Sequence, residues 1–95
     1  MISFLKGTIE EITDSSILMD VHDIGYELLA STQTLENLEC YKEMKIHTYL
    51  HVREDEMTLF GFYAKDELTM FKLLIKVNGV GPKAALALIS NVGTD

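Results

Sequence analysis

Hydrophobic and polar positions alternate along much of residues 1–63, which is the pattern of half-buried β-strands. The alternation is clearest between residues 44 and 53. One face of that segment carries Met44, Ile46, Leu50 and Val52, and the other carries Lys45, His47, His51 and Arg53. The segment is therefore predicted to be a strand with one face in a core.

Turn-forming clusters divide this region into five predicted strands, at residues 2–13, 17–21, 26–30, 44–53 and 57–63. The turn between the second and third is expected over residues 22–25, and Gly7 predicts a bulge or sharp bend in the first. A short helix is predicted over residues 31–39, with Ser31 as a possible N-cap. Five strands with one interposed helix indicate a small closed barrel, of which the OB-fold is the best-known form.

From Ala64 the apolar residues follow a helical period, with a stripe at Leu68, Phe71, Leu74 and Ile75. Asn78-Gly79 is expected to end this helix. Pro82 suits the first position of a second helix, whose end is marked by Asn91 and Gly93. The predicted fold is thus mainly β with C-terminal helices: a barrel over residues 1–63, then a helical pair over residues 64–95.

The net charge of −7 argues at first against nucleic acid, because phosphate binding usually requires excess Lys and Arg. The charge is uneven, however. Residues 1–64 hold four basic and twelve acidic side chains, whereas residues 65–95 hold four basic and three acidic ones. A surface that faces DNA would therefore involve the second segment.

The chain has no apolar run near the ~20 residues that a membrane helix needs, and its N-terminus has no signal-peptide pattern. The single cysteine, Cys40, excludes an internal disulfide and is expected to be a buried thiol. A cytoplasmic protein without membrane contact is expected.

The segment Gly79-Val80-Gly81-Pro82-Lys83 carries the strongest chemical signal. A tight glycine turn before a helix leaves backbone N–H groups free, and with the helix dipole these form an anion site beside Lys83. The alternative is an ordinary helical hairpin in which Lys83 is solvated. A dinucleotide fingerprint is improbable because a helical pattern precedes it, and a Walker A loop lacks its Ser or Thr.

The acidic segment Glu54-Asp55-Glu56 lies between two predicted strands and is by itself most simply a solvated turn. Its consecutive acids lack the spacing of a calcium loop. His47 and His51 would lie about 13 Å apart along one strand, too far to share a metal. No nucleophile–base pair is evident, so we expect no catalytic residues, no metal and no cofactor.

Taken together, four segments resemble the RuvA family of bacterial Holliday-junction-binding proteins. The two long, specific ones are Arg53–Phe62 (REDEMTLFGF) and Leu74–Ala84 (LIKVNGVGPKA). Met1–Gly7 and Gly25-Tyr26-Glu27 are weaker. The resemblance runs over nearly the whole chain.

The resemblance implies an OB-fold through which four subunits form a flat plate, with tetramer against octamer left open. It implies a helix-hairpin-helix in which Gly79, Val80, Gly81 and Lys83 contact DNA phosphate, and an acidic pin made by Glu54 and Asp55. The role of Glu56 is left open. It also implies a non-catalytic subunit, because the ATPase is the partner motor RuvB. RuvB binds a third domain that this chain, which stops at Asp95, does not contain, so a fragment or proteolytic core is expected.

The sequence is compatible with three candidate functions. The first is structure-specific binding of four-way junction DNA in recombination and DNA repair. The second is an OB-type assembly module whose helical tail binds protein rather than DNA. The third is an unrelated hydrolase or nucleotide-binding enzyme.

Overall fold

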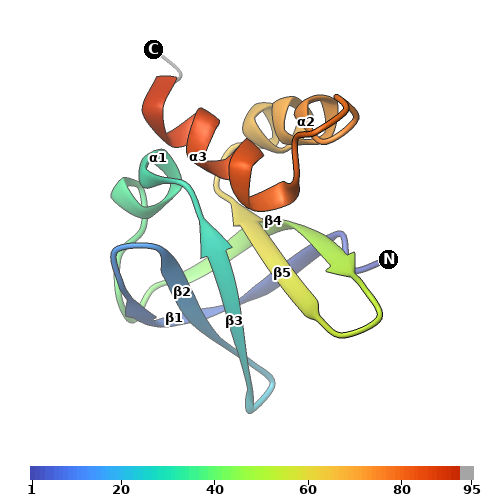
Figure 1. Cartoon of the computed structure of the whole chain (residues 1–95). Helices are drawn as coiled ribbons and strands as arrows, with labels where there is room; N and C mark the ends of the chain where they lie inside the picture. Colours follow the sequence, from blue (N-terminus) through green and yellow to red (C-terminus); the bar gives the residue numbers. More distant parts are fainter. Residues whose placement is uncertain (93–95) are drawn as a thin grey trace.

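The structure, a computed structural model, describes residues 1–92 and places three helices at one end of a β-barrel (Figure 1). The expected helix end at Gly93 lies outside the described residues. No helix in the described part is long and apolar enough to cross a membrane. The elements, in chain order, are β1 (Phe4–Ile12), β2 (Ser16–Val21), β3 (Ile24–Ala30), α1 (Thr32–Glu36), β4 (Glu43–Val52), β5 (Met57–Phe62), α2 (Lys65–Leu74) and α3 (Pro82–Val92).

The five strands form a closed barrel in the order β1-β2-β3-β5-β4, with β4 pairing back onto β1. All neighbours are antiparallel except β3 and β5, which run parallel through two residue pairs, Leu29 with Phe60 and Ala30 with Gly61. α1 connects β3 to β4, so β5 can enter the sheet between them. The predicted mainly-β fold, a five-stranded OB-like barrel with C-terminal helices, is confirmed.

Two local predictions need correction. The β2–β3 turn is made by His22 and Asp23, both left-handed at φ 52° and 68°, while Gly25 lies in β3 opposite Asp20. The side chain of Asp20 accepts a hydrogen bond from Asp23 N at 2.9 Å, which helps an aspartate take the conformation expected of a glycine. The helix expected over residues 31–39 is shorter, Thr32–Glu36, although Ser31 does cap it.

Gly7 marks a close approach between strands. A Cβ at this position would overlap the carbonyl oxygen of Asp20 on β2 and lie 2.8 Å from a methyl of Val21. The register shift of β1 against β2 falls slightly later, between Ile9 and Glu11. The expected irregularity is therefore present, with the bulge separate from the glycine that allows the strands to approach.

The barrel interior forms the first of two apolar clusters. Its central side chains come from alternate positions of the strands, as the period-two pattern predicts. The buried members are Leu5, Ile9, Ile17, Met19, Leu28, Ala30, Ile46 and Leu59.

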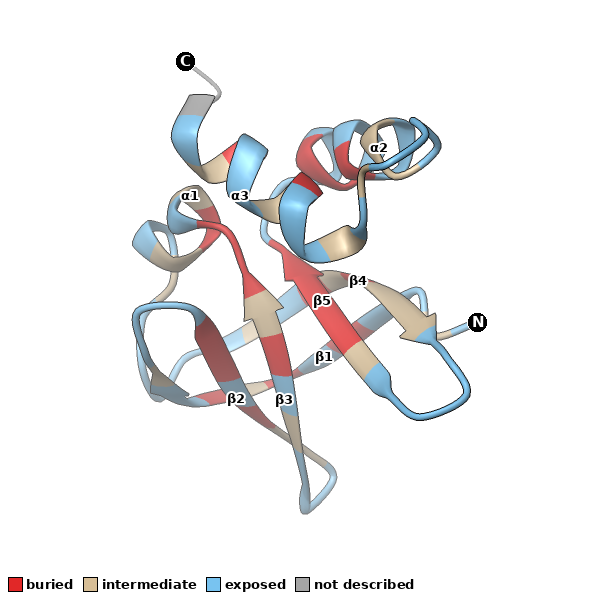
Figure 2. Ribbon diagram, in the orientation of Figure 1, coloured by how far each residue is buried: buried red, intermediate tan, exposed pale blue. Residues whose placement is uncertain are grey.

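The second apolar cluster lies outside the barrel, between β5 and the helices. Four consecutive residues of β5, Leu59–Phe62, are buried, because the strand has the barrel interior on one face and α2 and α3 on the other (Figure 2). The ring of Phe71 on α2 lies 5.4 Å from that of Tyr49, 5.2 Å from Phe60 and 4.9 Å from Phe62. The helices therefore share their core with the barrel.

Candidate nucleic-acid interface

The segment between α2 and α3 is a compact turn closed by short-range hydrogen bonds. The helix expected to reach Asn78-Gly79 ends earlier, at Leu74. After Ile75 the N–H groups bond three residues back, Lys76 N to Leu73 O at 3.2 Å and Val77 N to Leu74 O at 3.1 Å. Val80 N then donates to Val77 O at 3.1 Å. The first two bonds tighten the chain before Gly79, and the third closes the turn around it.

The two glycines of this turn have different backbone requirements. Gly79 has φ +85°, a conformation that costs an L-residue energy. Gly81 has no such φ, and a Cβ built on either glycine would meet nothing within 4 Å. The positive φ of Gly79 thus explains why a glycine stands there. The absence of a side chain at Gly81 leaves the backbone at the start of α3 open to approach.

α3 begins at Pro82, as predicted, and its first helical bond runs from Ala85 N to Gly81 O at 2.9 Å. The N–H groups of Lys83 and Ala84 precede that bond, so they have no partner in the preceding turn of the helix. With the positive end of the helix dipole and the exposed Lys83 ammonium, this turn has the chemistry of an anion site.

The start of α3 also faces the barrel across a cavity of about 220 Å³. Residues about 30 positions apart in the chain line it together, which the sequence alone did not reveal. They are His51, Arg53, Glu56, Phe60, Gly81, Pro82, Lys83 and Ala84.

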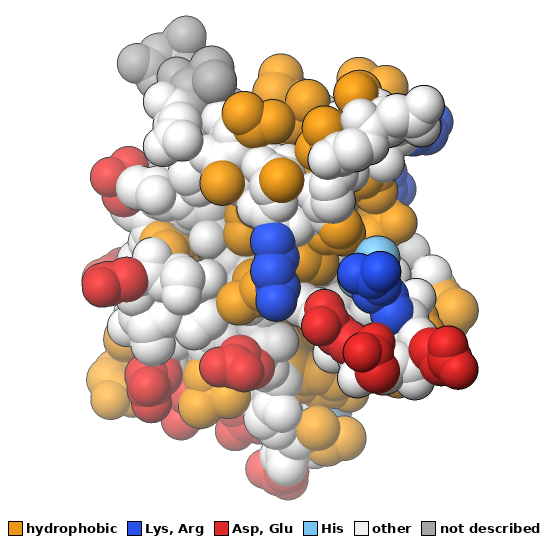
Figure 3. Space-filling model, viewed as in Figure 1, with side chains coloured by type: hydrophobic (Ala, Val, Ile, Leu, Met, Phe, Trp, Pro, Cys, Tyr) orange, Lys and Arg blue, Asp and Glu red, His pale blue; other side chains and the backbone are white. Residues whose placement is uncertain are grey.

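The acidic turn between β4 and β5 is narrow and exposed. Arg53 N donates to Glu56 O at 2.7 Å, which leaves Glu54 and Asp55 at the tip. Figure 3 shows acidic side chains gathered over this turn, with basic side chains between them and the helices. The predicted solvated tip is therefore present, next to the surface that carries the candidate anion site.

Glu56 is held differently from Glu54 and Asp55. Its carboxylate accepts a hydrogen bond from the Thr58 hydroxyl at 3.2 Å, and it lines the cavity that Lys83 lines. Glu54 and Asp55 line a separate hollow beside Arg53. Of the three consecutive acids, Glu56 therefore lies at the cavity beside α3, whereas Glu54 and Asp55 lie at a different part of the surface.

Within the described residues, the histidines and Cys40 do not form a metal site. Burial lowers the pKa of the His47 imidazole from its ordinary value, and the nearby charges of Lys45 and Lys65 lower it further. No group of three or more His, Cys, Asp and Glu side chains within residues 1–92 could hold a metal ion. Cys40 is exposed, so the expected buried thiol is wrong: the residue lies in the connection before β4, outside the barrel.

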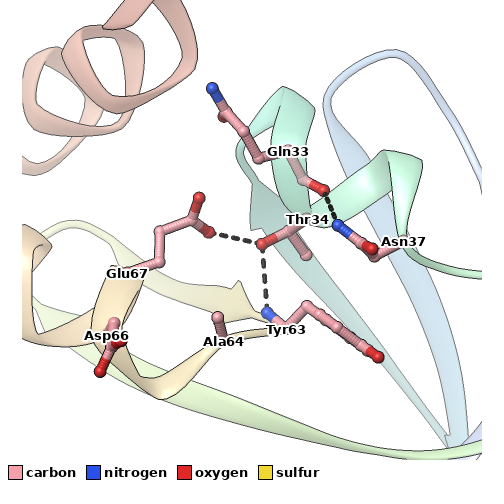
Figure 4. A pocket seen from close by; sticks show the side chains of 7 residues that line it. All are labelled: Gln33, Thr34, Asn37, Tyr63, Ala64, Asp66 and Glu67. Carbon is pink, nitrogen blue, oxygen red and sulfur yellow. Dashed lines mark hydrogen bonds between the residues drawn. The ribbon is translucent and has the colours of Figure 1, made fainter. Parts of the chain in front are cut away.

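Nothing in the sequence indicated the structural role of Glu67, a buried acid in the first turn of α2. Glu67 is 4% exposed, and its carboxylate accepts hydrogen bonds from Ser31 Oγ at 2.9 Å and Thr34 Oγ1 at 2.6 Å. The Thr34 hydroxyl oxygen in turn accepts from Tyr63 N at 3.1 Å (Figure 4). This network joins α1 to α2 at the point where the chain leaves β5.

α1 also holds the far end of α3. Gln33 Nε2 donates to the carbonyl oxygens of Ile89 at 3.0 Å and Ser90 at 3.2 Å, and Thr32 N donates to Ser90 Oγ at 3.1 Å. Because α1 contacts both helices, it fixes α2 and α3 against the barrel. The Gly79–Lys83 turn therefore has a set position relative to the acidic turn.

Together, the closed barrel and the helical pair with its open glycine turn define an OB-like barrel protein with a candidate phosphate-binding element. Comparison with known proteins specifies the family: the RuvA N-terminal domain profile matches residues 1–61. The chain belongs to the RuvA family.

Its curated relatives include proteins named "Holliday junction branch migration complex subunit RuvA". That of Lachnospira eligens is 46% identical over 96 aligned positions, covering all of this chain and 46% of the relative. That of Bdellovibrio bacteriovorus is 46% identical, covering 95% and 47%, and that of Coxiella burnetii strain Dugway is 47% identical, covering 100% and 48%. The chain spans about half the length of these relatives.

Replacing Glu67 by Ala should lower the free energy of unfolding by about 2–4 kcal/mol, because it leaves two buried hydroxyls without their acceptor. Asp66→Ala removes an exposed acid from the same helical turn and should cost less than about 1 kcal/mol. Urea unfolding of both variants measures the difference. If both variants lose the same free energy of unfolding, the hydrogen bonds of Glu67 contribute no more stability than an exposed acid gains from the helix dipole.

The two glycines should respond oppositely to alanine. Gly79→Ala should destabilise the chain by about 1–2 kcal/mol because of its positive φ. Gly81→Ala should leave stability unchanged or raise it by up to about 1 kcal/mol, because its surroundings are open and alanine restricts the unfolded chain. The urea midpoints of the two variants test this, and a large loss for Gly81→Ala would contradict the assignment.

Proposed function

We propose that this chain recognises four-way junction DNA as the non-catalytic subunit of a branch-migration complex in recombination and repair. The observation that carries the proposal is family membership: relatives that match the whole chain are named subunits of a Holliday junction branch migration complex. The exposed glycine turn supports it with a chemical means of holding DNA.

In this proposal residues 1–63 act as the OB-fold domain and residues 64–95 contain the first helix-hairpin-helix. Gly79, Val80, Gly81 and Lys83 contact backbone phosphate. The support is the open backbone at Gly81, the N–H groups at the start of α3, and the adjacent Lys83 ammonium. Such a site needs few basic residues, which is compatible with a net charge of −7.

We further propose that four copies assemble through the barrel, with an octamer as the doubled form. Exposed apolar side chains on the strands support a contact between copies, among them Val52 at 58% and Met57 at 71% exposure. The curated relatives extend to about twice this length. We propose that contact with the ATPase motor RuvB falls to the part of the relatives that this chain does not cover. We also propose that the protein acts in the cytoplasm without a cofactor.

An assembly module whose helical tail binds protein remains the second candidate. Exposed apolar residues on the helical pair favour it, since Leu73 is 61% and Val77 54% exposed. A junction-binding protein and a protein-binding module give different results with DNA, so one binding experiment separates them.

A labelled four-way junction should bind in the presence of excess linear duplex, and Lys83→Ala should weaken that binding. Loss of one phosphate contact should reduce the dependence of log K on log salt by about 1, equally for different DNA sequences. Titrations between about 50 and 200 mM salt measure this slope.

Gly81→Val serves as the steric companion of that variant, because it blocks backbone approach and retains every charge. Equal binding to junction and duplex would contradict the proposed recognition of junction shape. Loss that depends on base sequence would mean base readout and would contradict the phosphate assignment. Wild-type chain that fails to bind either DNA would contradict the proposed function for residues 1–95.

Glu54 and Asp55, the proposed acidic pin, should repel DNA at the centre of the assembly. Two unit charges ~10 Å apart at an effective dielectric of ~20 repel by roughly 1–2 kcal/mol, less once salt screens them. A continuous duplex would cross the centre and meet this repulsion, whereas the arms of a junction diverge around it. Glu54→Gln combined with Asp55→Asn should therefore tighten duplex binding more than junction binding.

The measurement is the ratio of the two dissociation constants at fixed salt, for wild type and double variant. Light scattering on the same samples reports whether four copies are present, since this repulsion arises only where several copies of the pair meet. A ratio that does not change in a confirmed tetramer would reduce Glu54 and Asp55 to a solvated turn.

A further inference from the structure

We propose that Glu56 sets the affinity of the Gly79–Lys83 turn for DNA, by holding a negative charge at the wall of the cavity that a phosphate approaches. This inference rests on the proposed function, because it takes that turn as the phosphate-binding element. It assigns to Glu56 a role distinct from that of Glu54 and Asp55.

Hydrogen bonds place Glu56 beside the cavity. The Glu56 side chain turns from the tip toward β5, where the Thr58 hydroxyl donates to its carboxylate at 3.2 Å. The backbone of Glu56 is paired with that of Arg53, which closes the turn. The carboxylate is thus held beside the cavity, whereas Glu54 and Asp55 line a different hollow.

The residues that line the cavity carry charges of both signs. Arg53 from the barrel and Lys83 from α3 supply two cations, and the start of α3 adds the positive end of its dipole. Glu56 is the carboxylate among the lining residues, and His51 is the remaining titratable group. A fixed carboxylate here offsets part of the attraction that an incoming phosphate would otherwise feel.

The size of the cavity makes this effect local. A cavity of about 220 Å³ corresponds to a cube with an edge of ~6 Å, which is shorter than the screening length of about 10 Å in 0.1 M salt. Charges on its walls therefore act on a group that enters it, while distant acids on the barrel are screened. Glu56 is itself exposed, so its influence is expected to be moderate and to shrink as salt rises.

The effect should not depend on DNA shape, because junctions and duplexes both present phosphates. Neutralising Glu56 should strengthen binding to the two DNAs by a similar factor. Neutralising Glu54 and Asp55 should instead change the ratio between them. These two outcomes separate an affinity-setting residue from a shape-selecting pair.

The test compares Glu56→Gln with Glu43→Gln in this chain. Glutamine keeps an oxygen that can accept from Thr58, and Glu43 is an exposed acid at the opposite end of β4, about 30 Å away along the strand. Fluorescence anisotropy with one labelled junction and one labelled duplex gives the dissociation constants, at about 50 and 200 mM salt. Thermal unfolding checks that both variants fold as wild type.

Glu56→Gln should tighten binding to both DNAs by about three- to fivefold at the lower salt and by less at the higher salt. Glu43→Gln should change either constant by less than about twofold. Equal effects of the two variants, or tightening by Glu56→Gln that salt does not reduce, would overturn the inference.

Lys83→Ala in the same titrations separates failure of the inference from failure of the proposed function. If Lys83→Ala weakens binding but Glu56→Gln does not tighten it, the turn binds phosphate and only the role of Glu56 is wrong. If Lys83→Ala has no effect, the turn is not the phosphate site and both proposals fail.

Discussion

The burial of β5 on both faces is the constraint on which the rest of this structure depends. Leu59 fills the barrel interior, while Phe60 and Phe62 lie under the helices and meet the ring of Phe71. A strand that belongs to two cores cannot shift register without moving apolar side chains out of both. The position of the helical pair is thereby linked to the pairing of the strands, although α2 and α3 lie outside the barrel.

Polar contacts make this arrangement specific. Apolar packing around Phe71 is tolerant of small rotations, whereas the hydrogen bonds of Glu67 to Ser31 and Thr34 have strict geometry. Gln33 adds the same kind of restraint at the other end of α3. The result is a glycine turn whose position relative to the acidic turn is set by the fold.

The sequence predicted those features that depend on local pattern. The barrel strands, the apolar stripe of α2 and Pro82 at the start of α3 all follow from periodicity and backbone chemistry. Features that depend on tertiary contact escaped it. Nothing in the sequence around Glu67 indicates that its partners lie more than 30 positions earlier, and nothing around Glu56 indicates that α3 faces it. Backbone chemistry indicated the Gly79–Lys83 turn as a candidate anion site, whereas only the family resemblance singled out Glu54 and Asp55 as a candidate acidic pin.

The parallel pairing of β3 with β5 has a consequence for the dynamics of the barrel. Two residue pairs join these strands, whereas β2 and β3 share six. The Glu67 network begins where that seam ends, since Ser31 follows β3 directly and Tyr63 follows β5. The side-chain hydrogen bonds of the Glu67 network thus extend the short backbone pairing between β3 and β5. Amide protons in the parallel pairing of β3 with β5 should exchange with solvent at a lower opening free energy than those in the antiparallel pairings. Because this part of the barrel lies beneath the helices, local opening along it would also loosen the Glu67 hydrogen bonds that join α1 to α2.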